Sequence, residues 1–218
     1  MNVELLSITP DAEKLIETAG RTAYQSLNKQ RDGTEKTFVK MLVKRGHLSV
    51  LEHAYATFRI SGVSRAFTHQ LVRHRLCSFT QQSQRYVSEE NFNYTEPESI
   101  KNDPKAHKLF TKFMDDAKSL YMKLQKSGLK NEDARFVLPN AVDSAIVVTA
   151  NFREWRHIIE LRGKPDAQWE IRKAAVEILK ILKTHAPEAF EDFEIDEERE
   201  IITSLRSDIS KISAVFKT

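Results

Sequence analysis

The sequence predicts an α+β fold, in which about six helices and a small mixed sheet form a single domain over residues 1–218. Two patterns support this prediction. Segments with apolar residues at helical spacing end at Gly or Pro, and shorter segments between them alternate apolar and polar side chains. Neither an internal repeat nor a low-complexity linker divides the chain, and its 40% of hydrophobic residues is enough to build one core.

The first predicted elements are a strand, two helices and a turn. Residues 2–8 predict a short edge strand, and Thr9 is expected to cap the helix that follows. Residues 34–45 predict a second helix, because Gly46 stands where helices commonly end. Ser49-Val50-Leu51-Glu52 has the spacing of a capping box and predicts a short helical turn.

A strand and a helix are predicted next. Residues 54–61 alternate apolar and polar side chains, which is typical of a strand with one buried face. Residues 63–72 predict a helix, on which Arg65, His69 and Arg73 share one face because they recur at steps of four.

A long amphipathic helix is predicted over residues 104–127. Such a helix normally turns its apolar stripe toward the core. Here the stripe consists of Leu109, Phe113, Leu120 and Leu124. Residues 145–149 then predict a short, fully apolar strand.

Two helices complete the predicted fold. Asn151 begins a capping box, and the helix that it starts is expected to contain an ion pair between Arg156 and Glu160. The last helix is predicted over residues 167–185, with Asp166 as its N-cap. Residues 188–218 follow as an extension that starts with an acidic stretch.

The run from Arg73 to Tyr86 is the strongest indication of function. It lies in a window, residues 54–88, that contains no Asp or Glu, although 31 acids in 218 residues predict about five there. Its helix end and the loop with Ser83 and Arg85 combine guanidinium and hydroxyl donors, which bind phosphate well. A phosphate site is therefore the first interpretation. The alternative is a solvated basic loop, or an interface that pairs with the acids of residues 188–200.

Several classes of site are not supported by the sequence. Cys77 is the only cysteine, which excludes an intrachain disulfide and fits a reducing compartment. The seven histidines show no metal-ligand spacing, so no metal is expected, and no glycine-rich phosphate loop is present. A nucleophilic role for Ser83 is disfavoured because it has no adjacent base. The cationic neighbours of Cys77 would lower the pKa of its thiol, but a lone cysteine between Leu76 and Ser78 is more often a small buried residue. Without a leader or a long apolar run, the chain is expected in the cytoplasm and away from membranes.

The order of several motifs resembles that of the flavin-dependent thymidylate synthases. The defining motif is Arg73-His74-Arg75, then seven residues, then Ser83 and Arg85-Tyr86. The resemblance covers residues 46–187. It also includes the segments Gly46-His47-Leu48-Ser49-Val50-Leu51-Glu52-His53, Ala134-Arg135-Phe136-Val137-Leu138-Pro139, Asn151-Phe152-Arg153 through Arg162, and Ala167-Gln168-Trp169-Glu170-Ile171.

The resemblance implies a homotetramer with active sites built between subunits. It also implies the reductive methylation of dUMP to dTMP, with FAD as the cofactor and 5,10-methylenetetrahydrofolate and NADPH as co-substrates. Tetrahydrofolate would be the folate product. Arg162 would be the catalytic residue, because it would stabilise charge on the pyrimidine as N3 ionises.

Two sets of binding residues follow from the same resemblance. The FAD set is His47, Ser49, Glu52, Arg73, His74, Arg75, Gln81, Asn151, Arg153 and His157. The dUMP set is Gln70, Leu71, Val72, Arg73, Gln81, Gln82, Ser83, Gln84, Arg85, Arg135 and Arg162.

Two other classes of function were weighed against the enzyme. An arginine-rich nucleic-acid-binding module would place the arginines of the run on phosphates and stack Phe79 and Tyr86 on bases. The net charge of only +3 and the acidic stretch disfavour it. The other is a structural oligomer, in which the same arginines pair with the acids of residues 188–200.

Overall fold

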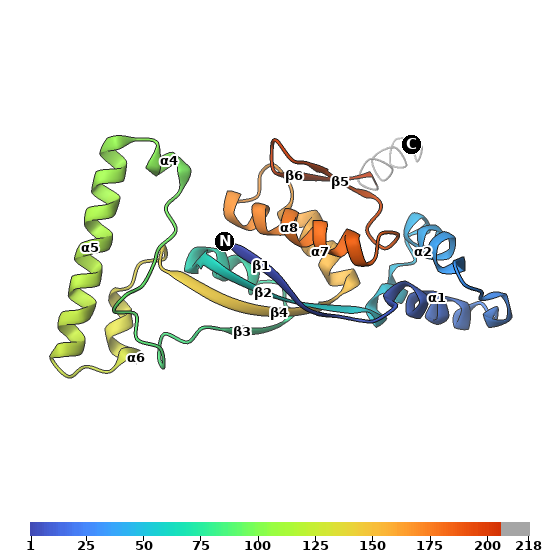
Figure 1. Ribbon diagram of the computed structural model, residues 1–218, viewed down its shortest axis with the longest axis horizontal. Helices are drawn as coiled ribbons and strands as arrows, with labels where there is room; N and C mark the ends of the chain where they lie inside the picture. Colours follow the sequence, from blue (N-terminus) through green and yellow to red (C-terminus); the bar gives the residue numbers. More distant parts are fainter. Residues whose placement is uncertain (206–218) are drawn as a thin grey trace, which may run out of the picture. The chain divides into compact units, whose positions relative to one another are not determined.

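A computed structural model describes residues 1–205 and shows a mixed helix-and-sheet fold, as the sequence predicts (Figure 1). By its contacts the described chain divides into two compact units. The first unit consists of residues 1–2, 60–73 and 79–147, and the second of residues 3–59, 74–78 and 148 onward. The single domain stays a prediction.

Four strands are hydrogen-bonded in the order β1-β2-β4-β3. Their bounds are Asn2–Ile8 for β1, Tyr55–Ser64 for β2, Ser78–Gln81 for β3 and Asp143–Asn151 for β4. β2 and β4 are longer than predicted, and each passes from one unit into the other. Gly62, with a φ of 63°, continues β2 where the sequence predicts a break between strand and helix.

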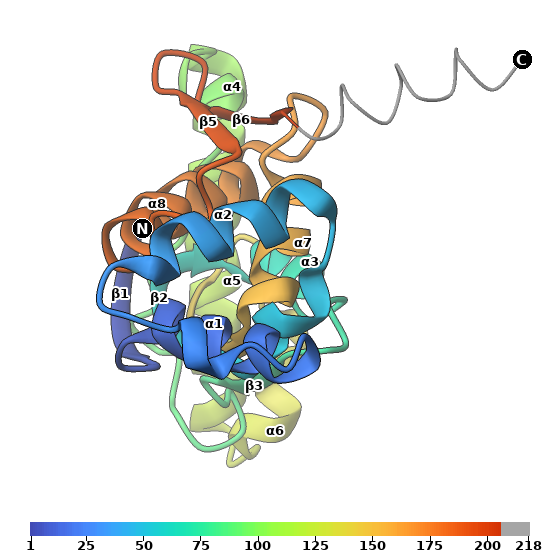
Figure 2. The same cartoon turned by 90° about the vertical axis from the view of Figure 1, so that its right-hand side faces the viewer.

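The second unit contains α1 (Ala12–Ala23) beside α2 (Thr34–Arg45), as Figure 2 shows. It also contains the short 3-10 helices η1 (Leu27–Lys29) and η2 (Leu48–His53), then α7 (Phe152–Arg162) packed on α8 (Trp169–His185). The strands β5 (Phe193–Asp196) and β6 (Ile201–Ser204) form an antiparallel hairpin, and β6 contacts both α7 and α8.

Aromatic side chains build the core of the second unit. Trp155 of α7 is fully buried and donates its indole N–H to the carbonyl of Ala56 over 3.0 Å. Its ring meets that of Phe58 edge-on, with centroids 5.1 Å apart, and Phe152 meets Phe190 in the same way at 5.3 Å. Such pairs contribute about 1 kcal/mol each beyond the burial of their area. The first pair packs α7 on β2, and the second packs α7 against the segment that follows α8.

The first unit contains α3 (Arg65–Leu71), α4 (Glu98–Lys101), α5 (Pro104–Lys126), α6 (Asn131–Ala134) and the 3-10 helix η3 (Arg135–Val137). Phe92, Met114 and Val142 form a small core between α5 and the loops. The buried hydroxyl of Tyr121 on α5 accepts the backbone N–H of Glu89 over 3.1 Å. α5 therefore holds the loop that follows β3.

The predicted helix caps are right at some positions and wrong at others. Gly46 ends α2 in the left-handed region, and Asn151 caps α7 by accepting the N–H of Glu154, as predicted. The predicted caps Thr9, Ser49 and Asp166 are wrong, although η2 confirms the short helical turn predicted at residues 49–52. The N-caps there are Asp11, His47 and Gln168, and Thr9 pairs instead with the backbone of Tyr55. The pairing of Thr9 with β2 therefore outweighs its local preference for the cap position, and α1 begins after Asp11.

The predicted stripe of α5 does not face the core of its unit. Leu109, Phe113 and Leu120 are 71, 57 and 45% exposed, whereas Met114 and Tyr121 on another face are buried. The helix thus carries two apolar stripes, and only one of them is covered within the described chain. Helical spacing reveals both stripes but cannot say which one the rest of the chain covers.

The acidic stretch is part of the fold and not only an extension. Residues 193–204 form the hairpin, which the sequence does not predict, just as it does not predict β3 or α4. The predicted pair of Arg156 and Glu160 is wrong, because Arg156 donates to both carboxylate oxygens of the buried Asp192 at 2.7 and 2.6 Å. The other ion pairs of the stretch join Glu191, Glu197 and Glu200 to Lys40, Lys180 and Lys173.

These pairs do not involve the arginines of the run from Arg73 to Tyr86. The structure of residues 1–205 therefore gives no support to a structural oligomer in which these arginines pair with the acids of residues 188–200. None of the helices in residues 1–205 has both the length and the apolar character needed to span a membrane.

Candidate active site

His74 is the centre of a polar cluster in the second unit. Its side chain is buried, and its Nε2 accepts the Nε–H of Arg162 over 3.0 Å. Its Nδ1 lies 3.5 Å from a carboxylate oxygen of Glu154, and its ring meets that of His157 edge-on at 5.7 Å. The cluster forms because the turn after α3 places His74 against the face of α7 that carries residues 154, 157 and 162.

Burial and the nearby positive charges keep the imidazole of His74 neutral. Burial first, then the positive charge of Arg162 and that of His157, lowers the pKa of His74 to about 4. A neutral imidazole that accepts at Nε2 carries its proton on Nδ1, on the side of Glu154. Burial raises the pKa of Glu154 above its usual range. His74 therefore contacts Arg162 as a neutral hydrogen-bond acceptor, which helps to orient the guanidinium.

Cys77 lies close to this cluster and is poorly suited to be a nucleophile. Burial, and secondly the negative charge of Glu154, raises the pKa of its thiol to about 12. The neighbouring arginines of the run do not lower it. A thiol with such a pKa is almost entirely protonated at neutral pH.

Arg75 lies with His74 in the turn after α3, and the other predicted FAD residues of the second unit lie on η2 and α7 or at their N-caps. Arg153 of α7 forms an ion pair with Glu52 of η2, which joins two of them directly. The Nδ1 of His47 is hydrogen-bonded to the hydroxyl of Tyr24 over 2.9 Å. Ser49 is exposed on η2, and the side chain of Asn151 is used as the cap of α7.

The predicted dUMP residues other than Arg162 all belong to the first unit. Gln70 and Leu71 end α3 and are followed by Val72 and Arg73, and Gln81 ends β3. Gln82, Ser83, Gln84 and Arg85 lie on the loop that follows β3, and Arg135 starts η3. The side chain of Leu71 is buried, so of this residue only the backbone is available to a ligand.

Hydrogen bonds fix several of these side chains in place. Gln81 donates to the hydroxyls of Thr68 and Ser144 at 2.9 and 3.3 Å. Arg85 donates to a carboxylate oxygen of Glu132 over 2.6 Å, and Arg135 donates to the carbonyl of the same residue over 3.2 Å. Glu132 therefore links two of the predicted phosphate-binding arginines.

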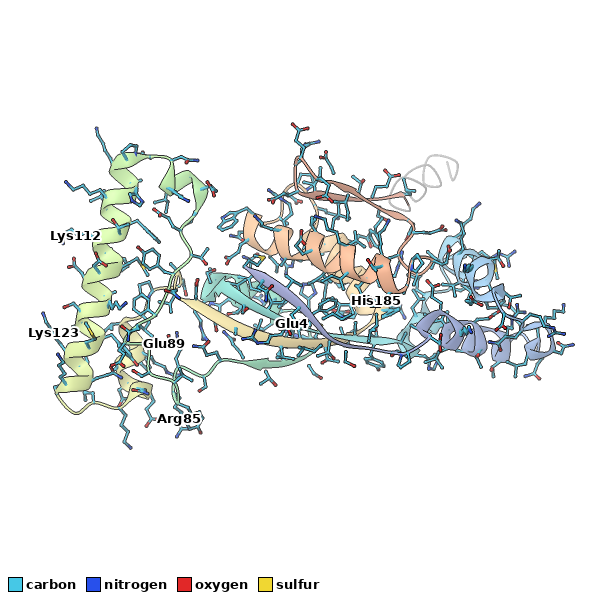
Figure 3. All side chains as sticks on the ribbon, in the orientation of Figure 1. Glu4, Arg85, Glu89, Lys112, Lys123 and His185 are labelled. Carbon is cyan, nitrogen blue, oxygen red and sulfur yellow. The ribbon has the colours of Figure 1, made fainter. Side chains whose placement is uncertain are left out.

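Arg65 and Glu89 join this group, although the sequence did not single out either as a site residue. Burial lowers the pKa of Arg65, and the positive charge of Arg135 lowers it further, so two guanidinium groups lie within electrostatic reach. Glu89 accepts from Gln82 over 3.0 Å, and burial raises its pKa. Figure 3 shows Arg85 and Glu89 after β3. The sequence does contain an indication that Arg65 belongs to the site, since it lies within residues 54–88, which contain no Asp or Glu.

Glu154 was also missed as a site residue. Its only role in the sequence pattern is that of a capping partner of Asn151, and a capping glutamate is ordinarily exposed. In the fold it is 6% exposed and faces His74. Nothing in the sequence indicates that burial.

The donor sets fit a dinucleotide with phosphate groups. Arg73 and Arg75 are exposed, and neither forms an ion pair within residues 1–205. Guanidinium groups without a carboxylate partner bind phosphate oxygens at two points. The imidazole of His157 and the amide of Asn151 are further groups that could donate to a ligand of this kind.

Comparison with known proteins gives a consistent result. Residues 4–188 match the model of a family described as thymidylate synthase complementing protein. The chain is 44% identical to a flavin-dependent thymidylate synthase of Geobacter sulfurreducens over 200 residues, which cover 88% of this chain and 86% of the relative. Proteins of the same name from Mycolicibacterium gilvum and Corynebacterium efficiens are 43 and 42% identical. These matches cover 83 and 85% of this chain and 79 and 81% of the relatives.

Proposed function

Because the chain belongs to the family of flavin-dependent thymidylate synthases, we propose that it converts dUMP to dTMP. The methylene group would come from 5,10-methylenetetrahydrofolate and the reducing equivalents from NADPH through FAD, with tetrahydrofolate as the other product. The membership and the concentration of guanidinium groups in a chain without a glycine-rich phosphate loop support this proposal.

The contact between Arg162 and His74 is the observation that carries the mechanism. A uracil ring becomes a better nucleophile at C5 as negative charge develops over N3 and the adjacent carbonyls. An oriented guanidinium beside that edge stabilises this charge, as donors do in an oxyanion hole. Since the Nε2 of His74 is a neutral acceptor, this contact orients the guanidinium of Arg162 without adding a negative charge beside it.

FAD, when bound, supplies the hydride chemistry, and the protein supplies binding and orientation. Arg73, Arg75 and Arg153 would hold its phosphates and His157 would donate to it. His74, whose imidazole is buried, would contact FAD without pairing with a phosphate. Asn151 would contact FAD while it caps α7. His47, Ser49 and Glu52 of η2 would line the flavin and folate region, and Gln81 would reach the ribose or a bound water.

The phosphate of dUMP would bind to Ser83, Arg85 and Arg135. Gln70, Gln82, Gln84 and the backbone of Leu71 and Val72 would contact the nucleoside. The ion pair between Arg85 and Glu132 holds Arg85 in place, with its side chain still 56% exposed. A phosphate with two negative charges competes well for a guanidinium that is only partly engaged.

A homotetramer in the cytoplasm completes the proposal. The exposed stripe of Leu109, Phe113 and Leu120 on α5 gives the chain an apolar face that assembly would cover. Active sites shared between subunits would bring further residues to each ligand set.

Purified protein tests the proposed function directly. We expect a yellow protein with flavin absorbance at about 450 nm. It should form dTMP from dUMP only when 5,10-methylenetetrahydrofolate and NADPH are both present. Colourless protein that does not take up FAD would refute the proposal.

An Arg162→Ala variant tests the assigned residue. It is expected to retain FAD and to lose at least about 2 kcal/mol of transition-state stabilisation in kcat/KM, the value of a charge-assisted donor. Arg45→Ala, which removes an exposed arginine at the end of α2, is the matched control and should leave kcat/KM unchanged. Equal values for the two variants would remove Arg162 from the mechanism.

A further inference from the structure

Gly163 follows Arg162 directly and is held by the second strand of the hairpin. Its N–H donates to the carbonyl of Ile159 over 2.9 Å, and its carbonyl accepts the N–H of Ile202 on β6 over 2.8 Å. The last turn of α7 is therefore bonded to the hairpin through the residue next to Arg162.

The two backbones approach so closely that position 163 has no room for a side chain. A Cβ added to Gly163 would lie 2.6 Å from the Cβ of Ile202 and 2.8 Å from the carbonyl oxygen of Ile159. The φ of Gly163 is −83°, which any residue adopts, so backbone conformation does not require glycine here. The requirement is the close contact with Ile202, which is itself 4% exposed.

A second contact joins the residues just before β5, and β5 itself, to the middle of α7. Arg156 donates to both carboxylate oxygens of Asp192 and, over 2.5 Å, to the carbonyl of Ala189. Its guanidinium also lies 4.7 Å from the centroid of the Phe193 ring on β5. Arg156 and Asp192 are both buried, so this contact is shielded from solvent.

The hairpin also forms ion pairs with α8. Its position is therefore set by α8 as well as by α7. Lys173 pairs with Glu200 at 3.4 Å, and Lys180 pairs with Glu197 at 2.7 Å. In Figure 1 the hairpin lies along α7 and α8 of its unit. Three residues of β5 and β6, namely Phe193, Ile201 and Ile202, are buried.

We propose that the β5–β6 hairpin positions Arg162: Ile202 against Gly163, together with Asp192 on Arg156, fixes the last turn of α7 and thereby the guanidinium that contacts His74. This inference rests on the proposed function, since it assigns the hairpin a part in dUMP binding and turnover. The hairpin lies beyond residues 4–188, to which the family model is matched. Ile202 and Asp192 are positioning residues, because they act through α7.

The test compares two Ile→Ala substitutions at buried positions of the same unit. Ile202→Ala removes the three carbons beyond Cβ from the side chain that packs on Gly163, and Ile16→Ala removes the same carbons from a buried position of α1. The FAD-loaded full-length protein is titrated with dUMP by calorimetry well below the melting temperature of each variant. Hydrogen exchange of the peptides that cover residues 152–163 is followed in parallel.

We expect Ile202→Ala to raise the Kd for dUMP at least about tenfold and to speed exchange at the end of α7, since small misplacements of binding groups have large effects. Ile16→Ala should lower the melting temperature but leave the Kd for dUMP within about twofold. Ile202→Val, which removes a single carbon and keeps the branching at Cβ, should stay close to the wild type. Equal effects of the two Ala variants on the Kd, or no effect of either, would overturn the inference.

A variant that leaves the hairpin unchanged provides a second test. Gly163→Ala is expected to weaken dUMP binding as Ile202→Ala does, and Gly163→Ala with Ile202→Gly should recover part of the affinity. Unchanged affinity in Gly163→Ala would overturn the inference. Wild-type protein that neither binds dUMP nor forms dTMP would instead refute the proposed function, so the two failures are distinguishable.

Discussion

His74 shows how one residue combines burial, charge and orientation. It is buried and hydrogen-bonded to Arg162, yet the run in which it occurs looks in the sequence like a solvated basic segment. Only the packing of α7 against the turn after α3 gives it a neutral imidazole and a fixed partner. The effect of this burial is measurable as a dependence of stability on pH.

The first prediction concerns this pH dependence. The imidazole of His74 has a pKa of about 4 in the folded protein against 6.5 ordinarily. Between these values the unfolded state binds more protons, so the free energy of unfolding should fall as the pH is lowered from about 6.5 to about 4. In a His74→Gln variant, whose amide oxygen still accepts from Arg162, this slope should be smaller. Urea unfolding at a series of pH values measures it, and identical slopes would contradict the assignment.

The second prediction concerns Cys77. Because burial raises the pKa of its thiol to about 12, the thiol should react slowly with iodoacetamide at pH 8 in the folded protein and rapidly in urea. Cys77→Ala should retain substantial dTMP synthesis. Loss of turnover with intact FAD and dUMP binding would revive a mechanism with a thiolate.

At the scale of elements, α7 has its two ends fixed by different means. Asn151 caps its start through a local hydrogen bond that the sequence predicts, whereas Gly163 and β6 hold its end through a contact between distant segments. In the middle, Arg156 pairs with Asp192 and not with its neighbour Glu160. A buried guanidinium requires a partner that shares its burial, and the exposed Glu160 does not provide one.

The third prediction follows from this buried pair. Asp192→Ala leaves a buried guanidinium without its carboxylate and should lower the free energy of unfolding by about 3–5 kcal/mol. Thermal and urea unfolding measure the loss. Arg156→Met in the same chain should recover much of it, because both charges are then removed. A loss below about 1 kcal/mol, the median for surface pairs, would show that the pair is solvated.

At the scale of the whole molecule, the two ligand sets fall largely into different units. The predicted FAD residues lie in the second unit except for Arg73 and Gln81, and the predicted dUMP residues lie in the first unit except for Arg162. The run from Arg73 to Tyr86 contributes to both units, since residues 74–78 belong to the second and the rest to the first. A single motif in the sequence therefore serves two separate parts of the fold.

The fourth prediction concerns assembly. Light scattering should give the mass of a tetramer, and a Leu109→Glu, Phe113→Glu double variant should lower it, because charges on the apolar stripe oppose its burial. Lys112→Glu is the control on the same helix; its side chain points into solvent and pairs with Asp116 (Figure 3). An unchanged mass in the double variant would show that α5 does not take part in assembly.

The sequence by itself determined the family, the class of fold and most of the helices. These depend on local signals: the spacing of Arg73, Ser83 and Arg85, the apolar periods, and terminators such as Gly46. Its ligand sets stay predictions. The tertiary structure alone decided which stripe of α5 is covered, that Glu154 and His74 are buried together, and that the acidic stretch folds onto α7. Each of these features depends on contacts between segments far apart in the chain. A local sequence pattern does not show which distant segment will pack against the residues that form it.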